Sequence, residues 1–140
     1  MNIKLAKKES IHFIGIGGIG MSGLAIIMQS LGFKIQGSDV TLNKNVERLR
    51  SRNIQVKIGH KINHINNATI IVISSAINKN NPELIIAKKR GLPVYKRGEM
   101  LGHIVSLMKN IVVAGSHGKT TTTSLICLLY TSPSPRDDEL

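Results

Sequence analysis

The fold of this chain is decided by residues 11–23, IHFIGIGGIGMSG. The run from Ile11 to Ile14 is short and mostly apolar, which is typical of a buried strand. Gly15, Gly17 and Gly20 follow it with the spacing G-x-G-x-x-G. Glycines at these positions allow a tight turn, and they let backbone N–H groups and the positive end of the next helix approach an oxyanion. The stretch therefore predicts a strand, a diphosphate-binding turn and a helix, as in Rossmann-like domains.

Outward from this stretch, short Ile- and Val-rich runs alternate with amphipathic segments. This alternation is typical of a parallel α/β sheet with helices on both faces. Gly32 and Gly91 are expected to end two helices, and Pro82 to begin one. The predicted strands are Ile11–Ile14, Lys34–Gln36, Ile54–Ile58, Thr69–Ser74, Val94–Lys96 and Ile111–Ala114, and the predicted helices are Met21–Leu31, Asn45–Arg52, Pro82–Arg90 and Gly98–Met108.

Asp39 follows the second predicted strand, where Rossmann domains carry an acidic residue that accepts hydrogen bonds from a ribose or a base. Taken alone, this residue and the glycines indicate an NAD site. Two interpretations stay open at this point. The first is an NAD(P)-binding module, and in the second the glycines serve only to pack the helix against the strand.

A second glycine loop, AGSHGKTTTT at residues 114–123, follows the predicted strand Ile111–Ala114. The backbone amides of residues 116–119 are suited to cradle phosphates. Lys119 is suited to neutralise the β and γ oxygens, and the Thr120 hydroxyl to bind Mg²⁺. Val113 stands where the full P-loop pattern has its first glycine, so the loop is a shortened G-x-x-G-K-T. An ordinary dehydrogenase does not need such a loop.

Composition excludes several classes of protein. The 140 residues are 41% hydrophobic and contain one cysteine, Cys127, which argues against disorder and against a disulfide-stapled secreted domain. A formal net charge of +11 invites a nucleic-acid interpretation, but only 3% of residues are aromatic and the lysines are scattered, so we expect no nucleic-acid partner. The glycines interrupt the apolar stretch near the start, so we expect neither a membrane span nor export, and a cytoplasmic location follows.

Six segments together resemble the Mur ligase family, and specifically the amino-terminal part of the members that join L-alanine to UDP-N-acetylmuramate. These segments are IGIGGIGMSGLA at 14–25, GSD at 37–39, IGH at 58–60, SSAI at 74–77, NPEL at 81–84 and AGSHGKTTTT at 114–123. The resemblance covers about residues 10 to 126, and Ser116 departs from it only slightly, since the family usually has Thr there. Other Mur ligases remain near alternatives, because the region that selects the amino acid lies beyond this sequence.

The resemblance implies an ATP-dependent ligase that acts through an acyl phosphate in peptidoglycan synthesis. Its substrates are UDP-N-acetylmuramate, L-alanine and ATP, with Mg²⁺ as the metal, and no obligate protein partner is implied. It assigns Lys119 a catalytic role and Thr120 the Mg²⁺. The implied ATP-binding residues are Gly115, Ser116, His117, Gly118, Lys119, Thr120 and Thr121, and the implied UDP-sugar-binding residues are Gly15, Gly17, Gly18, Ile19, Gly20, Met21, Ser22, Ser38, Asp39, His60, Ser74 and Ser75.

Several of these roles have plainer alternatives. His60 is equally well interpreted as a surface loop histidine, Ser74 and Ser75 as the end of a strand, and His117 as a residue that shapes its turn. The scattered His12, His64 and His103 suggest no metal site, so we expect structural or surface roles for them.

The domain organisation predicted from the sequence has three parts. Residues 1–109 form a Rossmann-like UDP-sugar-binding domain, and residues 110–126 begin the central ATP-binding domain. Residues 127–140, CLLYTSPSPRDDEL, contain two prolines that stop a helix, and we expect them to be a non-native tail. The chain is thus expected to be a fragment that binds the UDP-sugar without turning over ATP.

Overall fold

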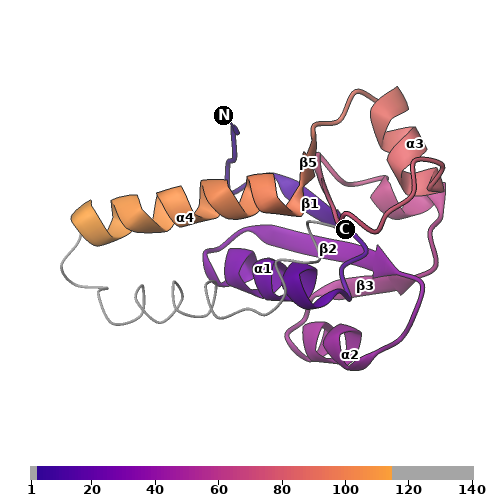
Figure 1. The fold of residues 1–140 in the computed structure, drawn as a ribbon, viewed down its shortest axis with the longest axis horizontal. Helices are drawn as coiled ribbons and strands as arrows, with labels where there is room; N and C mark the ends of the chain where they lie inside the picture. Colours follow the sequence, from indigo (N-terminus) through magenta and orange to yellow (C-terminus); the bar gives the residue numbers. More distant parts are fainter. Residues whose placement is uncertain (1–2, 115–140) are drawn as a thin grey trace.

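A computed structural model describes residues 3–114, and the side chains of residues 112–114 are not described. Its centre is a parallel five-stranded sheet in the order β3-β2-β1-β4-β5 (Figure 1). The predicted α/β sheet is therefore confirmed. The strands are β1 (Ser10–Ile14), β2 (Lys34–Asp39), β3 (Gln55–Ile58), β4 (Ile70–Ile73) and β5 (Val94–Lys96), and the helices are α1 (Ile19–Ser30), α2 (Lys44–Ser51), the short 3₁₀ helix η1 (Ile62–Ile65), α3 (Pro82–Lys89) and α4 (Arg97–Ala114).

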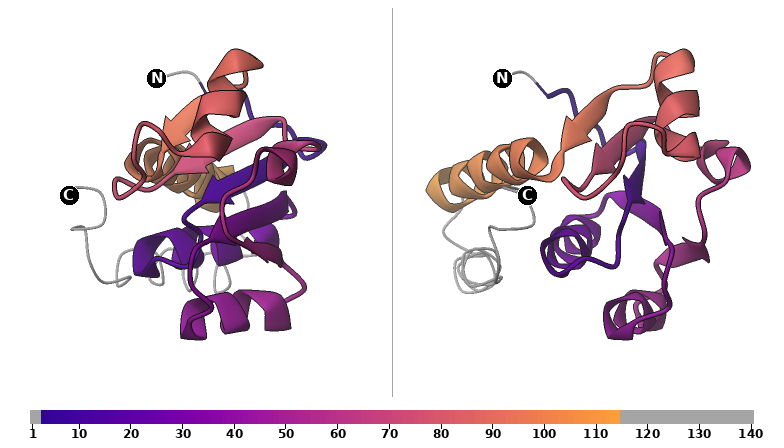
Figure 2. Two further views of the ribbon diagram at one scale, coloured as in Figure 1. Left: turned by 90° about the vertical axis from the view of Figure 1, so that its right-hand side faces the viewer. Right: turned by 45° about the vertical axis from the view of Figure 1, so that its right-hand side comes forward.

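Helices cover both faces of the sheet, as predicted (Figure 2). Successive residues of β1 point to opposite faces. Ile11 and Phe13 pack with α1, α2 and α4 in the larger core, and Ile14 packs with α3 and η1 in the smaller core. His12 points to the same side as Ile14 and is fully buried. A polar side chain therefore enters the interior beneath α3.

The ends of the helices follow the residues that the sequence places there. The Asn43 side chain accepts a hydrogen bond from Val46 N at the start of α2, and the Asn81 side chain caps α3, whose first residue is Pro82. Gly32 has φ +99° and ends α1, where Phe33 N donates to Met28 O. The predicted helix ends at Gly32 and Gly91 are confirmed.

The predicted strand Ile111–Ala114 is wrong, because these residues form the last turn of α4. Met100, Ile104 and Met108 recur every four residues, are fully buried and fix α4 against the sheet. Beyond Met108 a helix satisfies its own backbone hydrogen bonds, whereas a strand needs a neighbouring strand, and none of the described strands pairs with this segment. The β-branched residues at 111–113 therefore misled the strand prediction.

Other differences from the predicted elements are small. β2 continues to Asp39, beyond its predicted end at Gln36, and η1 was not predicted. α4 crosses residues 109 and 110 without a break, so the predicted domain boundary does not coincide with the end of a helix. The second glycine loop and the expected tail lie outside the described residues. Within residues 3–114, no helix combines the length and apolarity that crossing a membrane requires.

Candidate functional site

A cavity of about 480 Å³ opens at the carboxyl ends of β1, β2 and β4. The strand order changes direction between β1 and β4, and open α/β sheets bind ligands at such a switch point. The cavity is lined by Gly15, Gly17, Gly18, Asp39, Val40, Asn43, His60, Ser74, Ser75, Ala76, Ile77, Asn78 and Asn81. Seven of the residues expected to bind a UDP-sugar are thus brought together, namely Gly15, Gly17, Gly18, Asp39, His60, Ser74 and Ser75.

The first glycine loop needs glycine at two positions for different reasons. Gly15 has φ +86°, a conformation that residues with a side chain rarely adopt. Gly17 lies so close to its neighbours that a Cβ atom there would come within 2.7 Å of Asp39 Oδ2 and 3.0 Å of Val46 Cγ2. The glycines therefore let the end of β2 and the start of α2 close tightly around the loop.

Asp39 holds this loop in place. Its Oδ2 accepts a hydrogen bond from Gly17 N at 2.7 Å, and its Oδ1 accepts one from Val40 N at 2.8 Å. A carboxylate oxygen can accept more than one hydrogen bond, so Asp39 can still accept one from a ligand hydroxyl. The interaction of Asp39 with a ribose stays a prediction.

The start of α1 lies directly after the loop, and its N-cap residue is Gly18, which has no side chain to form a cap. The first N–H groups of a helix have no partner within the helix and favour a negative charge, so this end suits a phosphate. Ile19, Gly20, Met21 and Ser22 belong to this turn but are not among the residues that line the cavity. Met21 and Ser22 are fully buried, and the Ser22 hydroxyl donates to Ile19 O at 3.1 Å. Ser22 N already donates to Gly18 O at 2.8 Å, so of these two residues only Met21 would meet an anion, through its backbone N–H.

Ser74 and Ser75 follow β4 and face the loop from the other side of the switch point. Ser74 Oγ accepts a hydrogen bond from Ala76 N at 3.3 Å, in a turn typical of serine. Ser75 Oγ is the one buried side-chain polar atom, among those of the described residues, that lacks a hydrogen-bond partner. Since an unpaired buried hydroxyl is costly, Ser75 is suited to meet a polar group of a ligand.

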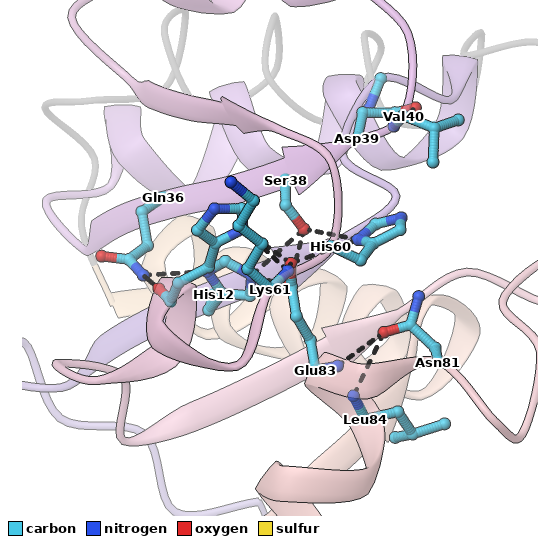
Figure 3. Close-up of polar contacts among 12 residues, drawn as sticks. His12, Gln36, Ser38, Asp39, Val40, His60, Lys61, Asn81, Glu83 and Leu84 are labelled. Carbon is cyan, nitrogen blue, oxygen red and sulfur yellow. Dashed lines mark hydrogen bonds and ion pairs between the residues drawn. The ribbon is translucent and has the colours of Figure 1, made fainter.

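A buried polar cluster adjoins the cavity, and Glu83 of α3 is at its centre (Figure 3). Glu83 is fully buried. Its Oε1 accepts hydrogen bonds from His12 Nε2 and from Ser38 Oγ, both at 2.7 Å. Its Oε2 lies 2.9 Å from His64 Nδ1 and 3.3 Å from His60 Nδ1. We call Glu83, His12, Ser38, His60 and His64 the Glu83 cluster.

Glu83 stays ionised inside the protein. Burial alone would raise the pKa of its carboxyl, but the hydrogen bonds from His12, Ser38 and His64 outweigh burial and lower the pKa from 4.5 to about 2. Lys61 N donates a further hydrogen bond to Oε2 at 3.2 Å. A buried carboxylate is tolerated here because several donors converge on it.

The orientation of His12 is fixed by a second contact. Gln36 Nε2 donates to the carbonyl oxygen of His64 at 3.1 Å, which identifies it as the amide nitrogen, and it also donates to His12 Nδ1 at 2.9 Å. His12 Nδ1 is therefore an acceptor. The proton of the ring is on Nε2, which donates the hydrogen bond to Glu83 Oε1.

Sequence reasoning missed Glu83 as a site residue. It appears in the motif NPEL, but a glutamate in the first turn of a helix is ordinarily explained by the helix dipole. One signal was present, since His12 interrupts an otherwise apolar strand and a buried histidine requires partners. The structural role expected for His12 and His64 agrees with their burial. Among residues 3–114, no group of His, Cys, Asp and Glu side chains is arranged to hold a metal ion.

Comparisons with known proteins agree with this geometry. Residues 10–109 match the Mur ligase family, catalytic domain. The UDP-N-acetylmuramate–L-alanine ligase of Pelagibacter ubique is 65% identical over 130 residues, which cover 93% of this chain and 28% of that protein. The protein of the same name from Azorhizobium caulinodans is 53% identical over 120 residues, covering 86% and 26%.

Solved structures give the same result. The UDP-N-acetylmuramate–alanine ligase of Thermotoga maritima matches with a TM-score of 0.69 and 28% identity, covering 71% of this chain and 23% of that one. A UDP-N-acetylmuramate:L-alanyl-γ-D-glutamyl-meso-diaminopimelate ligase from Neisseria meningitides matches with a TM-score of 0.64 and 28% identity, covering 68% and 30%. The chain thus spans less than a third of the length of each of these proteins. With its parallel sheet, its glycine loop at the switch point and a family match over 100 residues, this chain belongs to the Mur ligase family.

Proposed function

We propose that residues 1–109 bind the UDP part of UDP-N-acetylmuramate in the cavity beside the first glycine loop. The observation that carries this proposal is the first glycine loop, which lines the cavity at the switch point and leads directly into the start of α1, the end of a helix that favours a diphosphate. The choice of this sugar nucleotide comes from the names of the relatives. Two of them are UDP-N-acetylmuramate–L-alanine ligases, at 65% and 53% identity.

The lining of the cavity supports an ordered placement of the ligand. Gly17 and Gly18 lie at the carboxyl end of β1, Asp39 ends β2, and His60 follows β3, which is farther from β1 in the sheet. A diphosphate at the loop therefore places the ribose near Asp39 and the base on the side of His60. Ser74 and Ser75 line the cavity on the other side of the switch point, where their hydroxyls would contact the diphosphate or the sugar.

The complete protein would then be an ATP-dependent ligase of the reducing cytoplasm, acting in peptidoglycan synthesis. A carboxylate oxygen of the muramoyl group attacks the γ-phosphorus of ATP, and ADP leaves. The amine of L-alanine attacks the acyl phosphate, and phosphate leaves. Residues 110–126 would begin the ATP-binding domain, with Lys119 and a Mg²⁺ ion at Thr120 neutralising the phosphates. Lys119 and Thr120 lie outside the described part of the chain.

A titration calorimetry experiment tests the proposed ligand. We expect UDP-N-acetylmuramate and UDP to bind this chain and to compete with each other, because both carry the diphosphate and the nucleoside. NADH tests the alternative of an NAD(P)-binding module. Tight NADH binding that UDP does not displace would overturn the proposal, whereas UDP binding that NADH does not displace supports it.

A further inference from the structure

His60 presents its two ring nitrogens to different surroundings. Nδ1 faces the Glu83 cluster, 3.1 Å from Ser38 Oγ and 3.3 Å from Glu83 Oε2. The opposite edge of the ring, which carries Nε2, points away from Glu83 toward the side where Asp39, Val40 and Asn81 lie (Figure 3). These three residues and His60 all line the cavity. His60 thus joins the buried cluster to the ligand site.

The cluster determines which nitrogen of His60 carries the proton. Ionised Glu83 can only accept hydrogen bonds. The Ser38 hydroxyl gives its proton to Glu83 Oε1, so a lone pair of Ser38 faces His60 Nδ1. Both neighbours of Nδ1 are therefore acceptors, and the proton is placed on Nδ1. In the neutral ring, Nε2 is then an acceptor.

The other two histidines of the cluster cannot serve in this way. The side chains of His12 and His64 are 1% and 8% exposed, that of His60 is 12% exposed, and only His60 lines the cavity. His12 has both nitrogens occupied, by Glu83 and by Gln36. The cluster therefore presents a single histidine ring to the cavity beside the glycine loop.

We propose that Glu83 is a positioning residue that fixes His60 as a hydrogen-bond acceptor toward the ligand, and that this acceptor recognises an N–H or O–H donor of the nucleoside. The proposal rests on the proposed binding of a UDP-sugar. A diphosphate has no donor when ionised, so His60 is assigned to the nucleoside and the glycine loop to the phosphates. The donor is either the N3–H of uracil or a ribose hydroxyl, and the two are separable by ligand analogues.

The unmodified chain provides the first test. ¹⁵N NMR shifts of the His60 ring, measured with and without UDP, are expected to show the proton on Nδ1. UDP, 3-methyluridine 5′-diphosphate and deoxy-UDP analogues are then titrated. Losing one hydrogen bond from a buried site should weaken binding about tenfold for the analogue that lacks the donor. If all analogues bind as UDP does, or if the proton lies on Nε2, the inference is overturned.

Substitutions at Glu83 provide the second test. Glu83→Ala frees Ser38 to donate to His60 Nδ1, so the ring should shift toward the Nε2–H form and UDP should bind about tenfold more weakly. Glu83→Gln should shift the ring in the same direction, because three donors on Oε2 favour the amide oxygen there, and the amide NH2 at the other position cannot accept the Ser38 proton. Glu47→Ala is the matched control, since Glu47 is also in the first turn of an Asn-capped eight-residue helix but is exposed. A merely structural role predicts no change in the NMR signature.

The two proposals fail in different ways. Absence of UDP binding to the unmodified chain overturns the proposed function. UDP binding with the proton on Nε2, or with no dependence on either donor, overturns only the role of Glu83 and His60. Should Glu83→Ala not fold, the NMR and analogue measurements on the unmodified chain still decide.

Discussion

The ionised state of Glu83 predicts a specific loss of stability in acid. The pKa of Glu83 is about 2 in the folded chain and is ordinarily 4.5. A carboxyl whose pKa is lower in the folded state stabilises the protein above its unfolded pKa, and this contribution is lost as the pH falls toward the folded pKa. The perturbation is Glu83→Gln, which removes the titration and keeps the size of the side chain.

The magnitude follows from the two pKa values. The difference between 4.5 and about 2 corresponds to about 3 kcal/mol of unfolding free energy, present in full near pH 5.5. At pH 3 the unfolded carboxyl is mostly protonated and the folded one is still mostly ionised, so about 2 kcal/mol of this contribution is gone. The difference in unfolding free energy between wild type and Glu83→Gln should therefore shrink by about 2 kcal/mol from pH 5.5 to pH 3.

Urea unfolding followed by circular dichroism measures this gap. The histidines that face Glu83 are His12, His60 and His64, and all three are present in both wild type and Glu83→Gln, so the two proteins are compared with each other at each pH. Glu47→Gln is the control, and its gap to wild type should not change with pH in this way. A gap for Glu83→Gln that is equal at pH 5.5 and pH 3 would refute the ionised, hydrogen-bonded state of Glu83.

Two further predictions concern the loop and the core. Gly17→Ala should weaken UDP binding at least tenfold without unfolding the chain, because its Cβ would lie 2.7 Å from Asp39 Oδ2 and displace the loop. Calorimetry measures the affinity and circular dichroism measures the folding, and an unchanged affinity would contradict the loop assignment. Ile104→Ala should lower the unfolding free energy by about 2–5 kcal/mol, because the side chain is fully buried between α4 and the sheet; a loss below 1 kcal/mol in urea unfolding would contradict this packing.

The sequence was sufficient for most of the fold because its local signals and its burial pattern agree. Gly32 and Gly91 end helices, Pro82 begins one, and the apolar β4 lies inside the sheet, between β1 and β5. The segment at 111–114 was predicted wrongly because β-branched residues favour strands only when a neighbouring strand supplies hydrogen bonds. That condition depends on tertiary structure and is not readable from a short run of residues.

For the site, the sequence was informative where the chemistry is local and uninformative where it depends on distant residues. The glycines and Asp39 follow a known spacing, and the structure places them together at one cavity. Glu83 and His12 are 71 residues apart, and neither belongs to a pattern that predicts their contact at 2.7 Å. The alternation of side chains in β1 and the packing of α3 bring them together, so the cluster follows only from the assembled sheet.

Ser38 connects the glycine loop to the Glu83 cluster. Its carbonyl oxygen accepts hydrogen bonds from Gly15 N at 2.9 Å and Ile16 N at 3.0 Å, while its hydroxyl donates to Glu83 at 2.7 Å. The next residue, Asp39, accepts from Gly17 N with its side chain and from Gly59 N, beside His60, with its carbonyl at 2.7 Å. The end of β2 therefore holds both the loop suited to the diphosphate and the histidine suited to the nucleoside. Because a single strand end fixes both groups, the distance between the two halves of the site is set before a ligand arrives, and less ordering remains to be done on binding.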